Sequence, residues 1–322
     1  MISPHRLPGW APFDTMISGS VRRMEMRDTG RTARTLEPLH AMAYFAPETE
    51  EHLVAAGLKR GRMCYFAGRA AAMGAVGPGV VVASFCNFSP TLVARHLPAA
   101  WELAAPGAVV EARYAAVDAA LRRMLGDDAV ASGEVAEAAR LARTATDAVT
   151  VEGRPLAAAH LDVPWPEAPH LVLWHALTVL REHRGDGHVA LLVDAGLSGL
   201  EALVTHTASG RGFVAPFAMA SRGWSQEEWD AGAAGLAERG LLAADGALTP
   251  EGAALRKRLE EDTDRLGAAP WLHLGAEGTA RLGEIGARLA AALVDAGCFP
   301  AGVFAAPRRP APVLPHSEVK SR

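Results

Sequence analysis

Apolar residues recur along most of this chain three or four positions apart, which is the spacing of one face of an α-helix. From Thr32 onward, Leu36, Leu39 and Ala43 fall on one such stripe, and alanine-rich stripes follow over residues 107–125 and 132–147. These stretches predict amphipathic helices. The apolar run over residues 80–85 fits either a short strand or the start of a buried helix. We therefore expect a mainly α protein.

Stretches rich in proline or lacking periodicity divide this pattern into segments. Residues 1–30 and 301–322 are aperiodic and are expected to be a flexible tail and a disordered tail. Residues 153–169 contain four prolines and form the best candidate for a linker. The pattern thus predicts a helical N-terminal module over residues 31–152, a second module over 170–266 and a C-terminal helix within 267–300.

The two modules share a weak internal repeat. Ala-Gly-Leu occurs at residues 56–58 and again at 195–197, and an aromatic residue precedes serine at Phe88-Ser89 and at Trp224-Ser225. Ala-Gly-Leu also ends many helices in alanine-rich chains, so coincidence is the alternative to duplication. A true duplication would place the natural ligand site between two related modules.

Composition and charge narrow the class of protein. A chain of 322 residues with 50% hydrophobic and 21% charged residues is globular and long enough for two domains. Its net charge of −4 argues mildly against a nucleic-acid binder. The three cysteines are widely spaced and form no CxxC pair, which fits a reducing cytoplasm. No apolar run is long enough to span a membrane, so no membrane partner is expected.

The segment over residues 225–266 resembles a known family. A predicted helix from Ser225 ends in Glu238-Arg239-Gly240-Leu241-Leu242, and Leu248-Thr249-Pro250-Glu251-Gly252 leads into a helix over 250–266 with Thr249 as its N-cap. This resembles the recognition helix and wing of MarR-type winged helix-turn-helix regulators, over residues of about 170–266. The chain as a whole resembles a group of actinobacterial helix-turn-helix proteins.

The resemblance implies a two-stranded wing and a ligand-responsive regulator, in which Ser225, Gln226 and Arg239 would contact DNA and a homodimer could present another face. The charges depart from that expectation. A recognition helix needs cations near phosphates, but this one carries Glu227, Glu228 and Asp230 in its first turns. The fold is therefore expected to serve mainly as a scaffold.

The densest cluster of ionisable side chains lies between residues 181 and 188. Gly185 and Gly187 are expected to break the helix there and form a loop. Cations and imidazoles at a helix end suit an anionic ligand. The candidate ligand-binding residues are Arg181, Arg184 and Asp186, and the candidate proton-transfer residues are His183, His188 and His175. The alternative is a structural network that ties two helices together.

Polar groups on apolar helices of the first half are further candidates for lining the same site. These are His40, Tyr44, Tyr65 and Arg69. Such groups also occur in cores, where their polar ends find a partner. No metal-ligand spacing and no glycine-rich phosphate motif is present, so neither a metal nor a cofactor is expected.

These observations leave three functional hypotheses. The first is a cytoplasmic protein that holds an anionic or aromatic small molecule between its two modules; the sequence does not decide whether it also catalyses a reaction. The second is a MarR-like, ligand-responsive regulator that binds DNA. The third is a pure interaction module.

Overall fold

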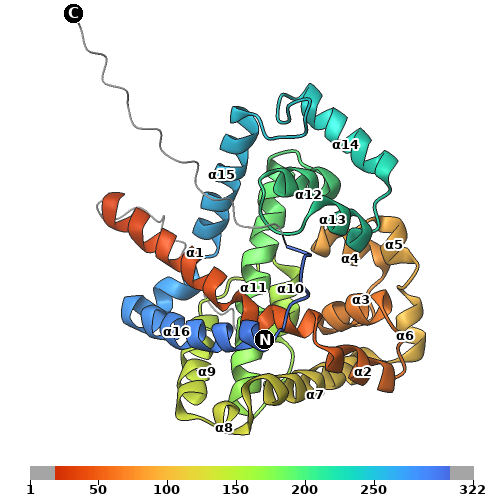
Figure 1. Cartoon of the computed structure of the whole chain (residues 1–322). Coiled ribbons are helices and arrows are strands. Elements are labelled where there is room, and N and C mark those ends of the chain that lie inside the picture. Colours follow the sequence, from red (N-terminus) through yellow and green to blue (C-terminus); the bar gives the residue numbers. More distant parts are fainter. Residues whose placement is uncertain (1–18, 305–322) are drawn as a thin grey trace, which may run out of the picture.

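Helices make up nearly all the regular structure of residues 19–304, the part of the chain that this computed structural model describes (Figure 1). The mainly α prediction is confirmed. The first half contains α1 (Gly19–Ala41), η1 (Met42–Tyr44), α2 (Pro47–Ala55), α3 (Arg62–Ala70), η2 (Ala71–Met73), α4 (Pro78–Phe85), α5 (Pro90–Ala94), α6 (Ala99–Leu103), α7 (Pro106–Leu125), α8 (Asp127–Val130) and α9 (Gly133–Thr146). The second half contains α10 (Pro155–Leu161), α11 (Pro169–Asp194), α12 (Gly199–Ala208), α13 (Ala215–Arg222), α14 (Gln226–Glu238), α15 (Pro250–Leu266) and α16 (Ala269–Asp295).

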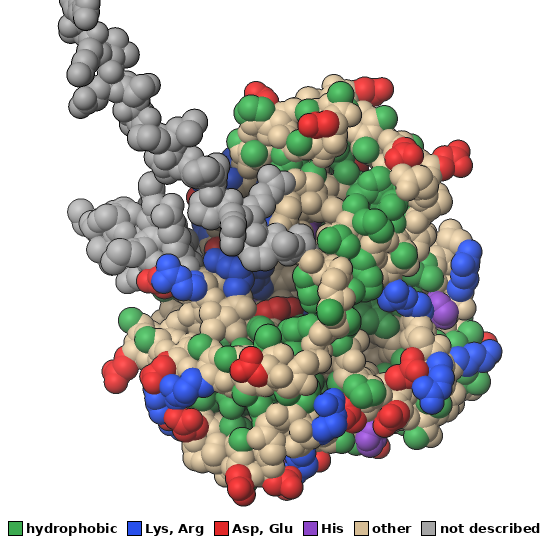
Figure 2. Space-filling view, viewed as in Figure 1, with side chains coloured by type: hydrophobic (Ala, Val, Ile, Leu, Met, Phe, Trp, Pro, Cys, Tyr) green, Lys and Arg blue, Asp and Glu red, His purple; other side chains and the backbone are tan. Residues whose placement is uncertain are grey.

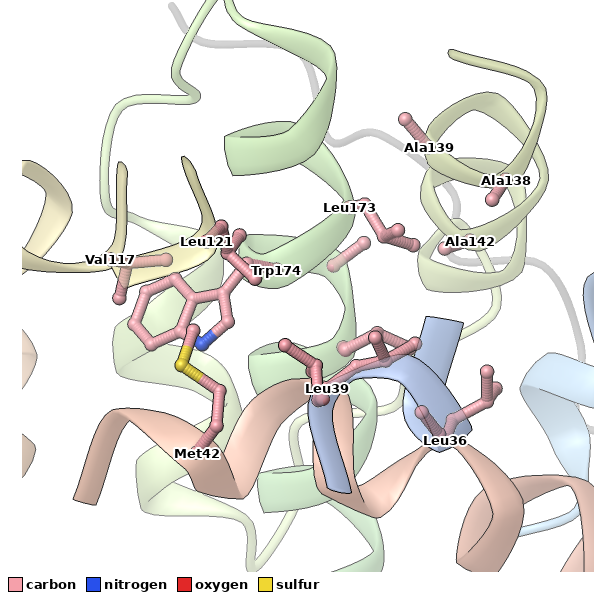
Figure 3. Close-up of a cluster of buried hydrophobic side chains, with 14 of the residues drawn as sticks. Leu36, Leu39, Met42, Val117, Leu121, Ala138, Ala139, Ala142, Leu173 and Trp174 are labelled. Atoms are coloured by element: carbon pink, nitrogen blue, oxygen red, sulfur yellow. The ribbon is translucent and has the colours of Figure 1, made fainter. Parts of the chain in front are cut away.

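The largest hydrophobic core joins α1, α7, α9, α11 and α16 (Figure 3). Trp174 on α11 fills its middle, packs beside Met42 and Val117, and donates its indole N–H to the carbonyl oxygen of His40 at 3.3 Å. On the other side, α9 presents alanines to α11, and their small side chains let the two helices approach closely. This core fixes the lower part of α11, the central helix in Figure 1.

Two smaller hydrophobic cores lie apart from this one. One is formed by α2 to α7 and is rich in aromatic rings, with Phe66 and Phe88 in an edge-to-face contact at 5.1 Å between centroids. The other joins the end of α11 to α12, α14 and α15 through leucines, including Leu192, Leu236 and Leu259. Because α11 contributes to the first and third cores, it connects the C-terminal helices to the rest of the chain.

The helix α11 runs without a break through the predicted loop at Gly185 and Gly187, so that prediction was wrong. The reason lies outside the segment. A Cβ added at Gly187 would lie 2.9 Å from Nη1 of Arg154 and 3.4 Å from Cβ of Leu266. Arg154 donates to the carbonyl oxygens of His183 and Leu266, the second at 3.0 Å. The glycine is therefore a point of close packing inside the helix and not a helix stop.

The helices α12, α13 and α14 are followed by a short turn and the long helix α15, in the order expected for the second module. Ser225 and Glu228 form the capping box of α14. Thr249 caps α15 through the backbone N–H of Gly252 at 3.1 Å, so the N-cap predicted at Thr249 is confirmed. The prediction of a two-stranded wing was wrong: in its place the structure has one isolated bridge between Leu242 and Leu248. A tight turn takes up residues 243–247 and leaves no length for strands.

Other boundaries differ from the predicted segments. The run over residues 80–85 is helical, within α4. Helix α1 begins at Gly19, inside the segment expected to be a flexible tail, and α10 lies inside the expected linker. Residues 1–18 and 305–322, which cover most of the two predicted tails, lie outside the described residues.

The segments that suggested a repeat contact each other. The backbone N–H of Ser89 donates to the carbonyl oxygen of Arg222 at 2.9 Å, and the indole N–H of Trp224 donates to the carbonyl oxygen of Asn87 at 2.9 Å. A Cβ at Gly199 would lie 2.0 Å from the carbonyl oxygen of Cys86. These contacts form a joint between the turn at residues 86–89 and the helix-turn-helix.

Within residues 19–304, no single helix has both the length and the apolar character needed to cross a membrane; two bent helix pairs, α3–η2 with α4 and α11 with α12, reach that criterion only in combination.

Candidate functional site

A cavity of about 410 Å³ lies beneath the helix-turn-helix, between the helices of the first half and those of the second. Its wall comes from α1, α3, α4, α11, α12, α13, α15 and α16. Part of the wall is apolar, formed by Leu36, Phe85, Phe88, Leu177, Leu180, Val189, Leu192, Leu203 and Trp271. We call this space the cation-lined cavity because of the side chains that make up the rest of its wall.

Six arginines line this cavity, namely Arg34, Arg69, Arg181, Arg184, Arg222 and Arg256. Two carboxylates, Glu37 and Glu260, share the wall with them. Two more carboxylates, Glu182 and Asp264, do not line the cavity but form ion pairs with arginines that do. The four acids leave two positive charges without compensation, and the buried setting screens these charges less than water would.

Five of these arginines form ion pairs. Arg69 and Arg181 both bind Glu182, whose side chain is fully buried. Burial alone would raise the pKa of that carboxyl, but the guanidinium groups of Arg69 and Arg181 outweigh it and lower the pKa. Arg184 binds Asp264 at 2.8 Å. Arg34 also binds Asp264, at 3.1 Å, and Arg256 binds Glu260 at 3.2 Å.

Arg222, at the end of α13, is the exception. Among the described residues it has no acidic partner, and Ser221 is its one side-chain hydrogen-bond partner, at 3.0 Å from Nη1. Its Nε is buried without a hydrogen-bond acceptor. The guanidinium lies 4.5 Å from the centre of the Phe88 ring and 5.2 Å from that of Phe213. Burial lowers the pKa of Arg222, and the effect of Tyr65 offsets part of that decrease. This is the group that a bound anion would stabilise most.

Three histidines line the cavity, and burial is the main cause that lowers the pKa of each. For His188 the pKa falls to about 4, so its imidazole is neutral at neutral pH. The hydroxyl of Thr263 donates to the carbonyl oxygen of Leu259 and so accepts from Nδ1–H of His188 at 2.8 Å, which leaves Nε2 as an acceptor. His206 accepts from Arg256 at 3.2 Å. The Nδ1 of the third, His40, has no partner.

Six of the predicted site residues line this one cavity. They are Arg181, Arg184, His188, His40, Tyr65 and Arg69. Tyr44 lies next to them: its hydroxyl is 3.5 Å from Nε2 of His40, and its ring centre is 5.4 Å from that of Tyr65. Tyr44 itself lines a second pocket, of about 330 Å³, which shares Tyr65 and Arg69 with the first.

The other three predicted residues do not line the cavity, because in the unbroken helix α11 they lie on the side turned away from it. His175 faces Tyr114, whose hydroxyl is 2.8 Å from its Nδ1, and burial lowers its pKa to about 4. His183 lies 3.4 Å from the hydroxyl of Thr150, with a pKa also lowered to about 4, mainly by burial. The carboxylate of Asp186 accepts two backbone N–H groups at the start of α10. His175, His183 and His188 therefore do not meet at one point.

The residues predicted to contact DNA are engaged within the protein. Ser225 caps α14, and the amide of Gln226 donates to Asp230 at 2.8 Å. Arg239 donates to the carbonyl oxygen of Gly196 at 3.1 Å and to Glu201 at 2.9 Å. In Figure 2 the surface over α14 shows acidic side chains. Among the described residues of this helix and its C-cap, the one cation is Arg239, which is already engaged, whereas a phosphate backbone requires free cations.

Several contributors to the cavity were not among the candidate residues. Glu182 lies between Arg181 and His183 in the ionisable cluster on α11, and a carboxylate at that position was a usable signal of an ion pair. The pairing of Arg256 with Glu260 follows from their i,i+4 spacing. Arg222 and His206 give no local signal, because only the tertiary fold brings them to the wall.

No group of three or more histidine, cysteine, aspartate or glutamate side chains within the described residues is arranged to hold a metal ion.

The fold and the cavity define the class: a helix-turn-helix protein whose helices close over a cation-lined cavity. A helix-turn-helix family model matches residues 29–300, so the chain belongs to that helix-turn-helix family. Searches of the curated proteins and of the solved structures found no match.

Proposed function

We propose that this protein binds a small organic anion with an apolar body in the cation-lined cavity, and that Arg222 binds the anionic group. The observation that carries the proposal is the unpaired guanidinium of Arg222 in a wall of otherwise paired arginines. A buried cation without an acid is costly, and an anion that reaches it removes that cost.

The neighbouring ion pairs support this role for Arg222. Arg69, Arg181 and Arg184 are already held by carboxylates, so a ligand would have to displace an internal partner to bind them. Their positive ends still contribute to the potential in the cavity. They would attract the anion, while Arg222 offers it free N–H donors.

The apolar part of the wall indicates the rest of the ligand. Leucine and phenylalanine side chains of α4, α11 and α12 form a surface against which an aliphatic or aromatic body can be buried. A volume of about 410 Å³ is within the usual range of small-molecule sites. A carboxylate with a ring or short chain satisfies both parts of the wall.

A thermal-shift series tests the proposal. The probes are benzoate, naphthalene-2-carboxylate and hexanoate, each compared with its neutral primary amide. The acids should raise the melting temperature, because a ligand that binds only the folded state at about a hundred times its Kd adds about 2.7 kcal/mol. The amides should raise it much less.

Matched arginine variants locate the site. Arg222→Met should remove the difference between acids and amides. Arg258→Met is the control, because Arg258 is exposed on α15 and does not line the cavity; it should leave the difference intact. Equal shifts for acids and amides, or a full shift in Arg222→Met, would show that the cavity does not bind anions through this residue.

Membership of a helix-turn-helix family favours a second candidate, a MarR-like regulator that binds DNA and responds to a ligand. The charges of α14 oppose contact through its first turns, so such a protein would have to use another surface or a dimer. The cytoplasm, where DNA and anionic metabolites are both present, is the proposed location for either function.

Fluorescence anisotropy with a duplex from the upstream region of its own gene tests the second candidate. A DNA-binding protein should bind at low salt and lose affinity steeply as salt rises. Replacing Glu227 with Gln should strengthen binding if α14 contacts the duplex, and should have no effect if another face does. No binding at low salt would exclude this function.

A further inference from the structure

The strongest unexplained group outside the cation-lined cavity is Arg113, on α7. Its side chain is only 6% exposed. It has no acidic partner and no hydrogen bond among the described residues, and its Nη2 is buried without an acceptor. A guanidinium stays charged at any ordinary pH. A permanent positive charge is thus buried there without compensation.

Aromatic rings take up the flat faces of this guanidinium. Its central carbon lies 4.8 Å from the centre of the Trp174 ring and 6.0 Å from that of Tyr44. Such contacts stabilise a cation, but they use its faces and not its N–H groups. The donors at the edge of Arg113 therefore remain available in the plane where a carboxylate binds with two parallel hydrogen bonds.

Arg113 lines the second pocket, of about 330 Å³, which lies between α2, α3, α7 and η1. Tyr44, Phe45 and Tyr65 supply aromatic walls there. The other two arginines of this pocket are paired, Arg60 with Glu50 at 2.7 Å and Arg69 with Glu182 at 2.8 Å. One further carboxylate, the exposed Glu51, also lines the pocket. The pocket thus combines one free, preorganised cation with an aromatic wall.

The histidines around Arg113 are held neutral. Burial is the first cause that lowers the pKa of His40, His160 and His175, and the charge of Arg113 is a further cause for each. His160 and His175 each also have an Nε2 without a partner. The surroundings of Arg113 therefore contain neutral rings, and the buried acid Glu182 is already bound by two other arginines.

We infer that the pocket at Arg113 is a second anion site, which takes the carboxylate of a small aromatic acid. The carboxylate accepts from the N–H groups of Arg113, and the ring of the ligand packs against Tyr44 and Tyr65. This site does not depend on the ligand proposed for the cation-lined cavity, because Arg113 does not line that cavity.

The probe for the test is 4-bromobenzoate, because bromine can be located by anomalous diffraction. Crystals of the full chain soaked with it should show a bromine peak in the pocket at Arg113, with the carboxylate on the guanidinium. The neutral 4-bromobenzyl alcohol should give no peak there. Soaking with inorganic phosphate separates a site for any oxyanion, where density would appear on Arg113, from a site that also needs the aromatic body.

Calorimetry with the same probe gives the second readout. Arg113→Met should weaken the binding assigned to this pocket at least tenfold. Arg113→Lys should weaken it less, because lysine keeps the charge but lacks the two parallel N–H donors of the guanidinium. Arg143→Met is the matched control: Arg143 also stacks on a tryptophan, Trp165, at 4.5 Å, but does not line this pocket. It should bind as the unaltered protein does.

The variant Arg222→Met separates the two sites. It should remove binding in the cation-lined cavity and leave the bromine peak at Arg113 in place. The absence of that peak from the unaltered protein, or unchanged affinity in Arg113→Met, would overturn the inference and leave Arg113 as a structural cation. If Arg113→Met does not fold, the bromine peak in the unaltered protein decides.

Discussion

Arg69 on α3 and Glu182 on α11 form a two-pronged ion pair across the middle of the molecule. The Nε and Nη2 of the arginine donate to the two carboxylate oxygens at 3.0 and 2.8 Å. The carboxylate also accepts from Arg181 at 3.1 Å. One buried acid thus fixes two arginines of the cavity wall and ties the first half of the chain to the central helix.

Replacing Glu182 with Gln should destabilise the protein by about 3–5 kcal/mol, because it leaves two buried guanidinium groups without their counter-charge. Urea denaturation measures the change. Glu261→Gln is the control, since Glu261 forms an exposed pair with Lys257 and should cost at most about 0.5 kcal/mol. Similar losses for the two variants would contradict the importance assigned to Glu182.

Stability should fall as the pH is lowered from about 6.5 towards 4. His175, His183 and His188 have pKa values lowered to about 4 in the folded protein, from an ordinary value of 6.5, and His160 has one lowered to about 3. Between these limits the unfolded chain binds more protons than the folded one. Each histidine then costs about 1.4 kcal/mol per pH unit.

Asp186 acts in the opposite direction. Burial raises its pKa to about 6 from 3.8, so the folded state takes up this proton more readily, and the group favours folding as the pH falls. Four histidines outweigh one carboxyl, so the net slope is set by the histidines. Urea midpoints at several pH values between 7 and 4.5 check this, and midpoints that stay constant would show that the histidines do not titrate as expected.

Replacing Gly199 with Ala should destabilise the joint between the halves. The new Cβ would lie 2.0 Å from the carbonyl oxygen of Cys86, so the backbone must shift, at a cost of about 1–3 kcal/mol. Gly133→Ala is a close control, because Gly133 also follows a serine N-cap and has open space around it. It should be neutral or stabilise by up to about 1 kcal/mol. A thermal unfolding series compares the two.

Cys86 should react with a thiol reagent before Cys64 or Cys298. It lines the cation-lined cavity and is half-buried, whereas the other two cysteines are buried. Burial raises its pKa, so alkylation at pH 7 should be slow and should speed up as the pH rises. Peptide mapping by mass spectrometry identifies the modified residue. An acid that occupies the cavity should protect it, and the matching amide should not.

Local signals in the sequence predicted the helix ends well. Helix α14 follows Ser225, and Thr249 caps α15, both as expected, because a helix start depends on residues within one turn. The spacing of apolar residues likewise located α7 and α9 to within a residue or two of the predicted ranges. These features need no knowledge of the rest of the fold.

Long-range contacts decided what the sequence could not predict. Gly187 stays helical because Arg154, from a distant segment, fills the space that a side chain would occupy. Six of the candidate residues meet at the cation-lined cavity, but the unbroken α11 turns His183 and Asp186 away from it. Arg222 differs from the other arginines by the absence of an acid nearby, and that property exists only in three dimensions.

The joint at Ser89 and Arg222 sets how the cavity can respond when it fills. The carbonyl oxygen that accepts from Ser89 belongs to the same residue whose guanidinium faces the ligand site. Helix α11 is packed into two cores and held by Arg154, which makes it the rigid wall. A ligand in the cavity would then displace α13 and not α11. Because α13 leads into the turn that starts α14, the displacement would pass to the rest of the helix-turn-helix.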